Sequence, residues 1–566
     1  RVGLRGDGAN VAQHAWRRRW AWAAWHGPIT RRSAALRSTA KHASWYDSEG
    51  VDGIPMVDDG EQRDLDAGEW IHRREFLVRT GLLLGAATLA ACGPPEPPQA
   101  MLLTGSPFPE QRQLSGTPIV RPAPASIAAS PGPGAAVAPA TPAARPPSES
   151  PSQQPAAVAT GPVPPALPSW ESVREQFNLA PGLIHMASFF LASHPGPVRD
   201  AIDAHRRGFD DNPIEYYGAN HGRCEAAVLK AAGTHLGVSP TDIALTDSTT
   251  MGLGLLYGGL KLDAGQEILT TVHDHYATTG ALQLRAQRTG SPLRSIRLYD
   301  DAARASQTEI VERLVAAVRP QTRVVAVTWV HSSTGVKLPI AAMAQALAQI
   351  NADRAEAERA LLCVDGVHGL GIEDVRMADL GCDFFVAGCH KWLFGPRGTG
   401  LVWGKPAAWA VATATIPSFD GEAYGRWMRG LPPAEFASGA RMTPGGFHAF
   451  EHRWALAQAF EFQLMIGKAR IAERIHGLNR RLKEGLAQLR RVQLHTPLVD
   501  DLSAGIVCFE VDGLAPAEVV PRLRERGIVA SITPYATRYV RLAPSLLTSP
   551  EEVDQTLRAV QGLASG

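Results

Sequence analysis

The chain has 566 residues, and its 56 Lys and Arg against 55 Asp and Glu give a formal net charge of +1 at pH 7. This balance argues against a nucleic-acid-binding protein, which would carry a basic bias. Six cysteines are too few for a disulfide-built scaffold, and the absence of a C-x-x-C pair argues against structural zinc. No run of about eighteen apolar residues occurs, which excludes a multi-span membrane protein.

Two regions differ in composition from the rest of the chain. Five of the 13 tryptophans lie in residues 1–55, and 21 of the 43 prolines lie in residues 93–168. Residues 169–566 then leave 398 residues, enough for one large core and a smaller companion domain. We expect a large domain over residues 169–466 and a small one over 467–566.

Residues 1–55 match no targeting signal. The sequence begins with Arg1, and Met56 lies 17 residues before the Arg-Arg pair at 73–74. An export signal normally lies near the start of translation. We therefore expect Met56 to be the first translated residue and residues 1–55 to be a non-structured or over-extended stretch.

Residues 56–92 resemble an export signal. Residues 73–77 are Arg-Arg-Glu-Phe-Leu, similar to the twin-arginine motif R-R-x-F-L. The Gly/Ala-rich stretch 81–91 is too short to span a membrane and ends in Leu-Ala-Ala before Cys92, like a lipobox. The pattern predicts passage through the twin-arginine export machinery and attachment of a lipid to Cys92. A chance Arg-Arg pair on an amphipathic helix is the alternative.

The Pro/Ala/Ser-rich residues 93–168 cannot bury a core, and proline keeps such a chain extended. We expect a disordered, semi-rigid tether between the membrane and the body, or otherwise a tail without a role. The predicted location is the periplasm or cell envelope, with membrane contact only through the lipid anchor. A non-functional signal would leave the protein in the cytoplasm.

From residue 170 onward, short apolar β-branched runs alternate with helical patterns. This alternation predicts an α/β fold, with a mostly parallel sheet wrapped by helices. Helices between the strands include 309–318 and 340–350. The predicted strands are 243–246, 267–271, 324–329, 361–365, 384–387 and 400–403.

The pattern changes after a long predicted helix at 453–466. The order becomes helix, strand, helix, strand, strand, helix, with strands at 505–511, 528–531 and 539–542. This order is typical of a small α+β domain packed on the end of the first.

Lys391 has the sequence context most typical of a catalytic residue. It follows the predicted strand 384–387 and precedes a Gly/Pro-rich loop. A lysine at a strand end inside a pocket loses hydration, so its pKa falls and its amine becomes nucleophilic toward aldehydes. Asp365 ends strand 361–365, at the edge where open α/β sheets bind ligands. A buried carboxylate needs a cationic partner there, and a protonated pyridine nitrogen would serve.

The ordered set of Asp365-x-x-His368, His390-Lys391 and the glycines of 395–400 resembles the class V aminotransferase family. These are pyridoxal 5′-phosphate (PLP) enzymes of fold type I, and they include cysteine desulfurases and isopenicillin N epimerase. The resemblance covers about residues 179–559. It implies a large domain with a mostly parallel, seven-stranded sheet, a small C-terminal α+β domain, PLP as cofactor and an α-amino acid as substrate.

The resemblance also implies roles for the residues at matching positions. Lys391 would hold PLP as an internal aldimine and act as proton shuttle, and Asp365 would pair with the pyridine nitrogen. His368 would contact the phenolic oxygen, and His390 would be a further cofactor contact.

The same resemblance places the remaining ligands. Thr249 and Thr250, where a strand runs into a helix, would bind the phosphate, since a helix N-terminus favours a dianion. His275 would stack over the pyridine as a catalytic and cofactor-binding residue. Arg541 would bind the substrate carboxylate through its guanidinium fork. Thr443 would reach the phosphate of a neighbouring subunit, which implies a homodimer with shared active sites.

Simpler roles are open for several of these residues. Thr249 and Thr250 could be plain helix caps, His275 could be a core or loop histidine, and Arg541 could be a surface salt-bridge partner.

Two positions depart from the family pattern. Gly388 stands where relatives often carry a phosphate-binding Ser, and Ser332 stands where they tend to carry an Asn near the cofactor oxygen. Both departures predict weaker binding of the cofactor.

These residues indicate which cofactor chemistry is available, but they do not identify the reaction. PLP weakens bonds to the α-carbon of an amino compound by acting as an electron sink. Cysteine desulfuration needs a mobile thiolate, but residues 527–540 hold no cysteine, and Cys508 lies in an apolar strand. Aminotransfer, epimerisation and C–S lysis remain, and we favour an aminotransferase or an isopenicillin N epimerase-like enzyme. The alternative from another class is a non-catalytic fold type I protein that binds a ligand.

Overall fold

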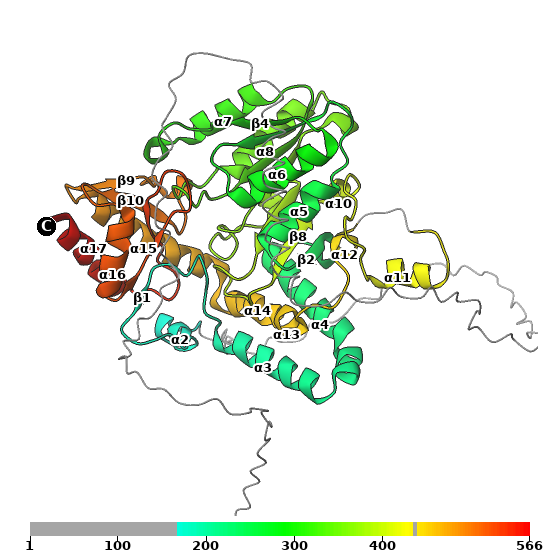
Figure 1. Ribbon diagram of the computed structural model, residues 1–566, viewed down its shortest axis with the longest axis horizontal. Helices are drawn as coiled ribbons and strands as arrows, with labels where there is room; N and C mark the ends of the chain where they lie inside the picture. Colours follow the sequence, from blue (N-terminus) through cyan, green and yellow to red (C-terminus); the bar gives the residue numbers. More distant parts are fainter. Residues whose placement is uncertain (1–166, 434–437, 566) are drawn as a thin grey trace, which may run out of the picture. The chain divides into compact units, whose positions relative to one another are not determined.

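The computed structural model describes residues 167–433 and 438–565 (Figure 1). The predicted export signal with Cys92, the predicted extension over 1–55 and the predicted tether up to residue 166 lie outside the described residues.

A mixed, mostly parallel sheet of seven strands lies at the centre of the described chain, in the order β2-β8-β7-β6-β5-β3-β4. Strand β8 is antiparallel to its neighbours β2 and β7, and the other neighbouring pairs are parallel. The strands are β2 (Ile243–Thr246), β3 (Glu267–Thr271), β4 (Leu293–Ile296), β5 (Thr322–Thr328), β6 (Leu361–Asp365), β7 (Phe384–Gly388) and β8 (Gly400–Gly404). This confirms the predicted α/β class and the seven-stranded sheet.

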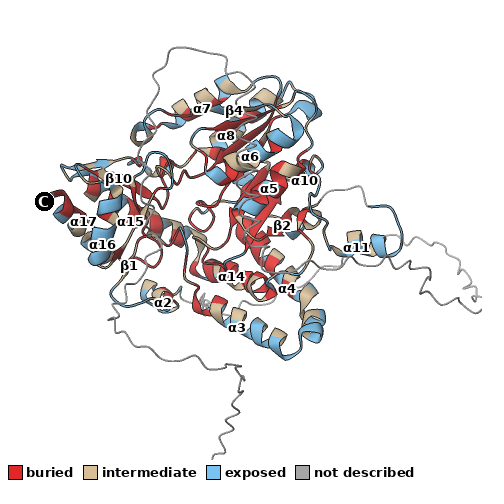
Figure 2. Ribbon diagram, in the orientation of Figure 1, coloured by how far each residue is buried: buried red, intermediate tan, exposed pale blue. Residues whose placement is uncertain are grey.

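Both faces of this sheet are buried, because successive side chains of a strand point to opposite faces. In β5, Val325 and Val327 pack into the cluster under α8 and α14, whereas Val324 and Ala326 pack into the cluster under α5 and α6. Figure 2 shows the central strands buried and the outer faces of the helices exposed. The helices of this part are α2 (Trp170–Glu175), α3 (Gly196–Asp211), α4 (Pro213–Leu236), α5 (Thr249–Gly259), α6 (Tyr276–Thr289), α7 (Gln307–Ala317), α8 (Ile340–Asn351), α9 (Met377–Leu380), α10 (Pro406–Trp409), α11 (Gly421–Met428), α12 (Gly439–Met442), α13 (Phe450–Trp454) and α14 (Leu456–Ile466).

The C-terminal part is built on an antiparallel sheet in the order β12-β13-β10-β9. It has its own apolar core, to which Ile184 and Met186 from the start of the described chain also belong. Strand β1 (Ile184–His185) pairs in parallel with β11. The elements are α15 (Lys468–Ala487), β9 (Val492–Leu494), β10 (Val507–Val511), α16 (Pro516–Glu525), β11 (Ile528–Val529), β12 (Ser531–Ile532), β13 (Val540–Leu542) and α17 (Pro550–Ser565).

Strands 243–246, 267–271 and 361–365 have the predicted bounds, and the other predicted strands apart from 528–531 begin and end within two residues of prediction. Strands β4 and β9 were not predicted, because each lies at a sheet edge and is only partly buried, which removes the apolar signal. The predicted strand 528–531 is two strands, since β11 pairs with β1 and β12 with β13. The predicted helix 453–466 begins at Phe450 and breaks at Ala455, where α13 ends and α14 begins.

Within the described residues, no helix combines the length and apolar character that a membrane span needs.

Candidate functional site

Most of the predicted site residues follow strands that end at one edge of the large sheet. Strands β2, β3, β5, β6 and β7 run in the same direction, so their carboxyl ends meet there, and this is the edge at which open α/β sheets bind ligands. A cavity of about 260 Å³ opens at this edge. Its lining includes Thr249, Thr250, His275, Asp365, His368, His390, Lys391 and Arg541.

Lys391 lies in the loop that leaves β7 and is partly buried where it lines the cavity. Burial lowers the pKa of its amine to about 8, although nearby Asp365 opposes this effect. The lysine carbonyl accepts a hydrogen bond from the backbone N–H of Phe394 at 3.0 Å, and Phe394 has a positive φ of 58°. A buried aromatic residue in this conformation is strained, and such strain persists only where the surrounding structure holds it. Lys391 is therefore an amine held in a rigid turn, with a pKa low enough for the neutral form to be well populated near pH 8.

Asp365 ends β6 and is 1% exposed. Its carboxylate accepts hydrogen bonds from the backbone N–H of Val367 at 3.2 Å and from the Thr278 hydroxyl at 3.4 Å. Burial raises its pKa to about 6, because these long bonds compensate little of the lost hydration. The charge of Lys391 lowers this pKa in part, but no cationic side chain of the described residues forms an ion pair with the carboxylate, so its environment suits a cationic ligand group.

The start of α5 also lines the cavity, through Ser248, Thr249 and Thr250. Ser248 is the N-cap of this helix, since its hydroxyl accepts from the Met251 N–H at 3.1 Å. Thr249 and Thr250 are therefore the first two helical residues rather than its cap. Free N–H groups and hydroxyls at such an N-terminus favour an anion.

The departure at Gly388 has a steric reason. The Gly388 N–H donates to the Thr249 hydroxyl oxygen at 2.7 Å. A Cβ at this position would lie 2.9 Å from that oxygen and 3.1 Å from the His390 ring. A serine would therefore collide with the threonine hydroxyl that faces the cavity, and the two positions are coupled.

Three histidines line the cavity, and burial lowers the pKa of each. His275 caps α6 through its Nδ1 atom, which accepts from the Ala277 N–H at 3.1 Å. Burial, with Lys391 and Arg541 nearby, lowers the pKa of His275, and burial lowers that of His390 to about 4. The pKa of the buried His368 is also lowered, well below its ordinary value. All three are neutral at pH 7, so they can donate or accept hydrogen bonds without adding charge.

Arg541 lies in β13 and is 4% exposed, which excludes a surface salt bridge. Its guanidinium donates to the Ser531 hydroxyl and to the Ser332 carbonyl, both at 3.0 Å, and to the Ile532 carbonyl at 3.4 Å. Its Cζ lies 4.5 Å from the centre of the Phe189 ring. A guanidinium has five N–H groups, so each terminal nitrogen keeps one N–H without an acceptor in the described residues. This is the fork that a carboxylate needs.

Thr443 is not brought together with these residues. Its hydroxyl accepts from the Leu245 N–H at 3.1 Å and donates to the Gly439 carbonyl at 3.4 Å, beside β2. Its predicted role in a neighbouring subunit's site stays a prediction.

Several site residues were missed by the sequence analysis. Phe189 and Phe190 come from the segment after β1 and line the cavity together with Pro534, whereas Ser332, which also lines it, had been noted as a departure from the family pattern. The hydroxyls of Ser332 and Tyr535 are 2.9 Å apart. No local pattern marks these positions, and residues 527–540 offered only the absence of cysteine.

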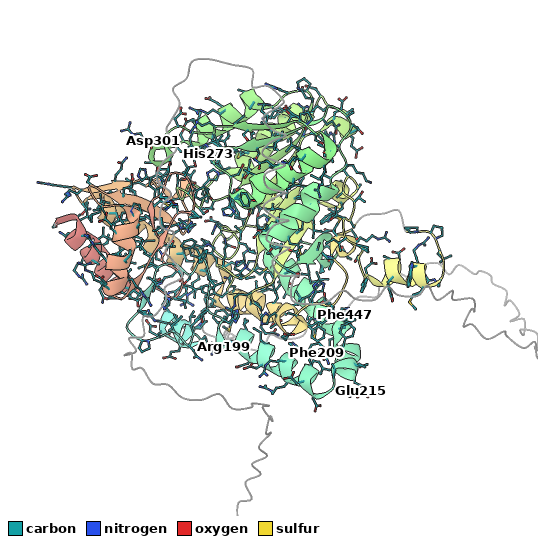
Figure 3. All side chains as sticks on the ribbon, in the orientation of Figure 1. Arg199, Phe209, Glu215, His273, Asp301 and Phe447 are labelled. Atoms are coloured by element: carbon teal, nitrogen blue, oxygen red, sulfur yellow. The ribbon has the colours of Figure 1, made fainter. Side chains whose placement is uncertain are left out.

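His273, Tyr299 and His331 form a second polar group, and none of the three lines the cavity. His273, labelled in Figure 3, stacks on Tyr299 with ring centres 3.9 Å apart. The Tyr299 hydroxyl lies 2.7 Å from His331 Nδ1. These contacts satisfy the Tyr299 hydroxyl and Nδ1 of His331, while Nε2 of His331 is buried without a hydrogen-bond partner in the described residues.

The family model for Aminotransferase class-V matches residues 228–535. Isopenicillin N epimerase of Streptomyces clavuligerus is 26% identical over 411 residues, which are 70% of this chain and 99% of the epimerase. A probable cysteine desulfurase of Vibrio cholerae is 24% identical over 410 residues, covering 67% of this chain and 93% of that protein.

Solved structures share the fold. A C-DES variant with glycine covalently linked to its PLP cofactor has a TM-score of 0.61 at 23% identity, covering 69% of this chain and 98% of C-DES. Apo cysteine desulfurase of Thermococcus onnurineus NA1 has a TM-score of 0.60 at 22% identity, covering 71% of this chain and 99% of that one.

The cavity fits pyridoxal phosphate. Asp365 is a buried carboxylate without a cationic partner, the start of α5 suits a phosphate, and Lys391 is a partly buried amine with a lowered pKa. The family model spans more than half of the chain, and the solved structures share its fold with TM-scores of 0.61 and 0.60. The chain belongs to the class-V aminotransferase family and has its fold type I architecture.

Proposed function

We propose that this protein is a PLP-dependent enzyme that acts at the α-carbon of an α-amino acid, by epimerisation or by aminotransfer. Bound PLP supplies an electron sink that weakens the bonds to this carbon. The observation that carries the proposal is the presence of Lys391, Asp365 and the open fork of Arg541 in one cavity. Epimerisation is favoured by the match to isopenicillin N epimerase over 99% of that protein.

Each residue has a task that its surroundings support. Asp365 would hold the pyridine nitrogen as its cationic partner, and the start of α5 would bind the phosphate. The two spare N–H groups of Arg541 would orient the substrate carboxylate. Lys391, with a pKa of about 8, would take the proton from the α-carbon and return it.

Cysteine desulfuration is disfavoured by the cysteines of the described residues. Cys224, Cys363, Cys382, Cys389 and Cys508 are all buried, and none lines the cavity. Burial raises the pKa of each thiol, to about 12 for Cys508. These thiols are therefore poor nucleophiles.

C–S lysis is a second candidate, since it needs no enzyme thiol. The structure of the cystine C–S lyase C-DES with its product cysteine persulfide shares the fold with a TM-score of 0.59. A non-catalytic ligand-binding role is the alternative from another class, and the retained Lys391 and Asp365 argue against it.

The test combines a spectrum with product analysis. We expect the purified protein to bind PLP with a visible absorbance band that Lys391→Ala loses or shifts. Amino acids incubated in D2O, with and without keto-acid acceptors, would then be followed by NMR and chiral chromatography. Formation of the opposite enantiomer with deuterium at the α-carbon indicates epimerisation, keto-acid formation indicates aminotransfer, and pyruvate with persulfide indicates lysis. A protein that stays colourless with added PLP would refute the proposal.

We also propose a homodimer. The segment around Thr443 lies next to Phe447, which is 86% exposed (Figure 3), and α11 carries the exposed Trp427 and Met428 on an excursion from the body (Figure 1). Large exposed apolar side chains are typical of protein interfaces. Sedimentation of the wild type and of Trp427→Glu tests this proposal, and a monomeric wild type would contradict it.

Export and a lipid anchor on Cys92 also stay proposals, supported by the sequence pattern of residues 73–92. Cell fractionation of the full chain and of its Arg73→Lys/Arg74→Lys variant, with mass spectrometry of the Cys92 peptide, tests them. A soluble cytoplasmic wild type without modified Cys92 would refute both.

A further inference from the structure

The imidazole of His368 lies between two nitrogen atoms of neighbouring side chains, and the proposed function does not explain this pair of contacts. Its Nδ1 atom is 3.2 Å from Nε1 of Trp392, and its Nε2 atom is 3.3 Å from Nζ of Lys391. Trp392 follows Lys391 directly in the sequence, so one turn of chain supplies both neighbours of the imidazole.

The indole N–H determines where the imidazole proton lies. An indole nitrogen can only donate a hydrogen bond, so Nδ1 of His368 must accept and cannot carry a proton. His368 is 5% exposed and is faced by Lys391, Arg541, His275 and His390. Burial and these neighbours disfavour the doubly protonated ring. A neutral imidazole has one proton, and it is therefore on Nε2.

The Nε2–H in turn points at the lysine amine. This donor lies 3.3 Å from Nζ, and only the unprotonated amine has the lone pair that could accept from it. We propose that Trp392 is a positioning residue: its indole N–H locks His368 in the Nε2–H form, and this form favours the neutral amine of Lys391. The same N–H becomes available to the cofactor when PLP is bound, a part of the inference that rests on the proposed function.

The indole itself is held firmly. Trp392 is 1% exposed, and its ring stacks on Phe189 with ring centres 6.2 Å apart. Its carbonyl accepts from the Gln463 side chain at 2.7 Å. A Cβ at Gly505 would lie only 2.4 Å from the indole ring, so the chain passes close against it. The ring has no room to turn its N–H away from His368.

Loss of the indole N–H releases the imidazole. With Phe at position 392, Nδ1 of His368 loses its donor, and the proton can move to Nδ1. Nε2 would then present a lone pair to Lys391, which favours the protonated lysine. The variant should therefore raise the pKa of the Lys391 amine.

The test reads the tautomer directly in the cofactor-free protein. In protein carrying 15N-histidine, long-range 1H–15N correlation spectra distinguish protonated from unprotonated ring nitrogens, and His368→Gln assigns the signals. We expect wild-type His368 to have an unprotonated Nδ1 and a protonated Nε2. In Trp392→Phe the Nδ1 signal should move toward the protonated position. Trp409→Phe is the matched control, because it removes another buried indole bond, to the Asp242 carbonyl, away from His368.

A second measurement follows Lys391. The pH dependence of its reductive methylation, read by mass spectrometry of the apoprotein, should shift to higher pH in Trp392→Phe and stay unchanged in Trp409→Phe. A wild-type His368 with a protonated Nδ1 overturns the proposal even if the variant fails to fold. An unchanged tautomer in a folded Trp392→Phe also overturns it. Neither measurement needs turnover, so failure of the proposed function would show separately, as absent PLP binding.

Discussion

Replacing Asp365 with Asn should change how the stability of the cofactor-free protein depends on pH. Burial raises the pKa of this carboxyl from 3.8 to about 6 in the folded protein. The folded state therefore holds this proton more tightly than the unfolded state does. The resulting stabilisation is fully present below pH 3.8 and is lost as the pH rises through about 6.

The size of the effect follows from the shift. Each pKa unit corresponds to about 1.4 kcal/mol, so between pH 4.5 and pH 7 the wild type should lose about 2 kcal/mol of unfolding free energy through this group. Asp365→Asn has no proton to release and should not show this loss. Titrating groups that do not interact with Asp365 act on both proteins alike and cancel in the difference, whereas Lys391, whose pKa is raised by Asp365, does not cancel fully.

Urea unfolding of the two apoproteins at both pH values, followed by circular dichroism, measures this difference. Asp379→Asn is the control: Arg376 lowers the pKa of this exposed carboxyl, so its small effect has the opposite sign. Equal pH dependence of wild type and Asp365→Asn would refute the view that Asp365 is a strained, unpaired carboxylate. The Asp365→Asn variant should bind PLP more weakly than the wild type, because Asn cannot neutralise a pyridinium. Titration with PLP, followed by absorbance, would show this difference.

Three further substitutions test other parts of the site. Arg541→Lys keeps the charge but loses the fork, so KM for amino acids should rise by about 10- to 100-fold, the value of one charge-assisted hydrogen bond; steady-state kinetics with an unchanged KM would contradict the assigned carboxylate site. Gly388→Ala would place a Cβ 2.9 Å from the Thr249 hydroxyl, so PLP affinity should fall while folding persists; equal dissociation constants in a fluorescence titration would exclude this coupling. Tyr535→Phe removes the bond to Ser332 and should cost about 1 kcal/mol of unfolding free energy; an unchanged urea midpoint would show that the contact is not formed in solution.

Much of the fold could be predicted because the strands of the large sheet are buried on both faces. Their continuous apolar runs are short and bounded by turn residues, so 243–246 and 361–365 were found with their observed bounds. The edge strand β4 was missed, because its residues are only partly buried and form no continuous apolar run. The split of residues 528–531 was missed because it depends on pairing with β1, more than 300 residues earlier.

Most of the candidate cavity could be predicted for a related reason. In a parallel sheet the residues that follow each strand converge at one edge, so Thr249, His275, Asp365 and Lys391 meet although they are far apart in sequence. The pattern of residue types was sufficient to place them there. The lowered pKa of Lys391 was predicted from its position, but the raised pKa of Asp365 was not, since it depends on which donors remain within reach after burial.

The sequence by itself determined the α/β class, the family and the chemical identity of the residues at the sheet edge, because local patterning and strand direction suffice for these. The tertiary structure alone decided three things: that Arg541 keeps two N–H groups free, that Gly388 makes room for the Thr249 hydroxyl, and that Trp392 directs the proton of His368. Each depends on the distance and direction between atoms that distant segments bring together, and hydrogen bonds are decided by tenths of an ångström that no sequence pattern encodes.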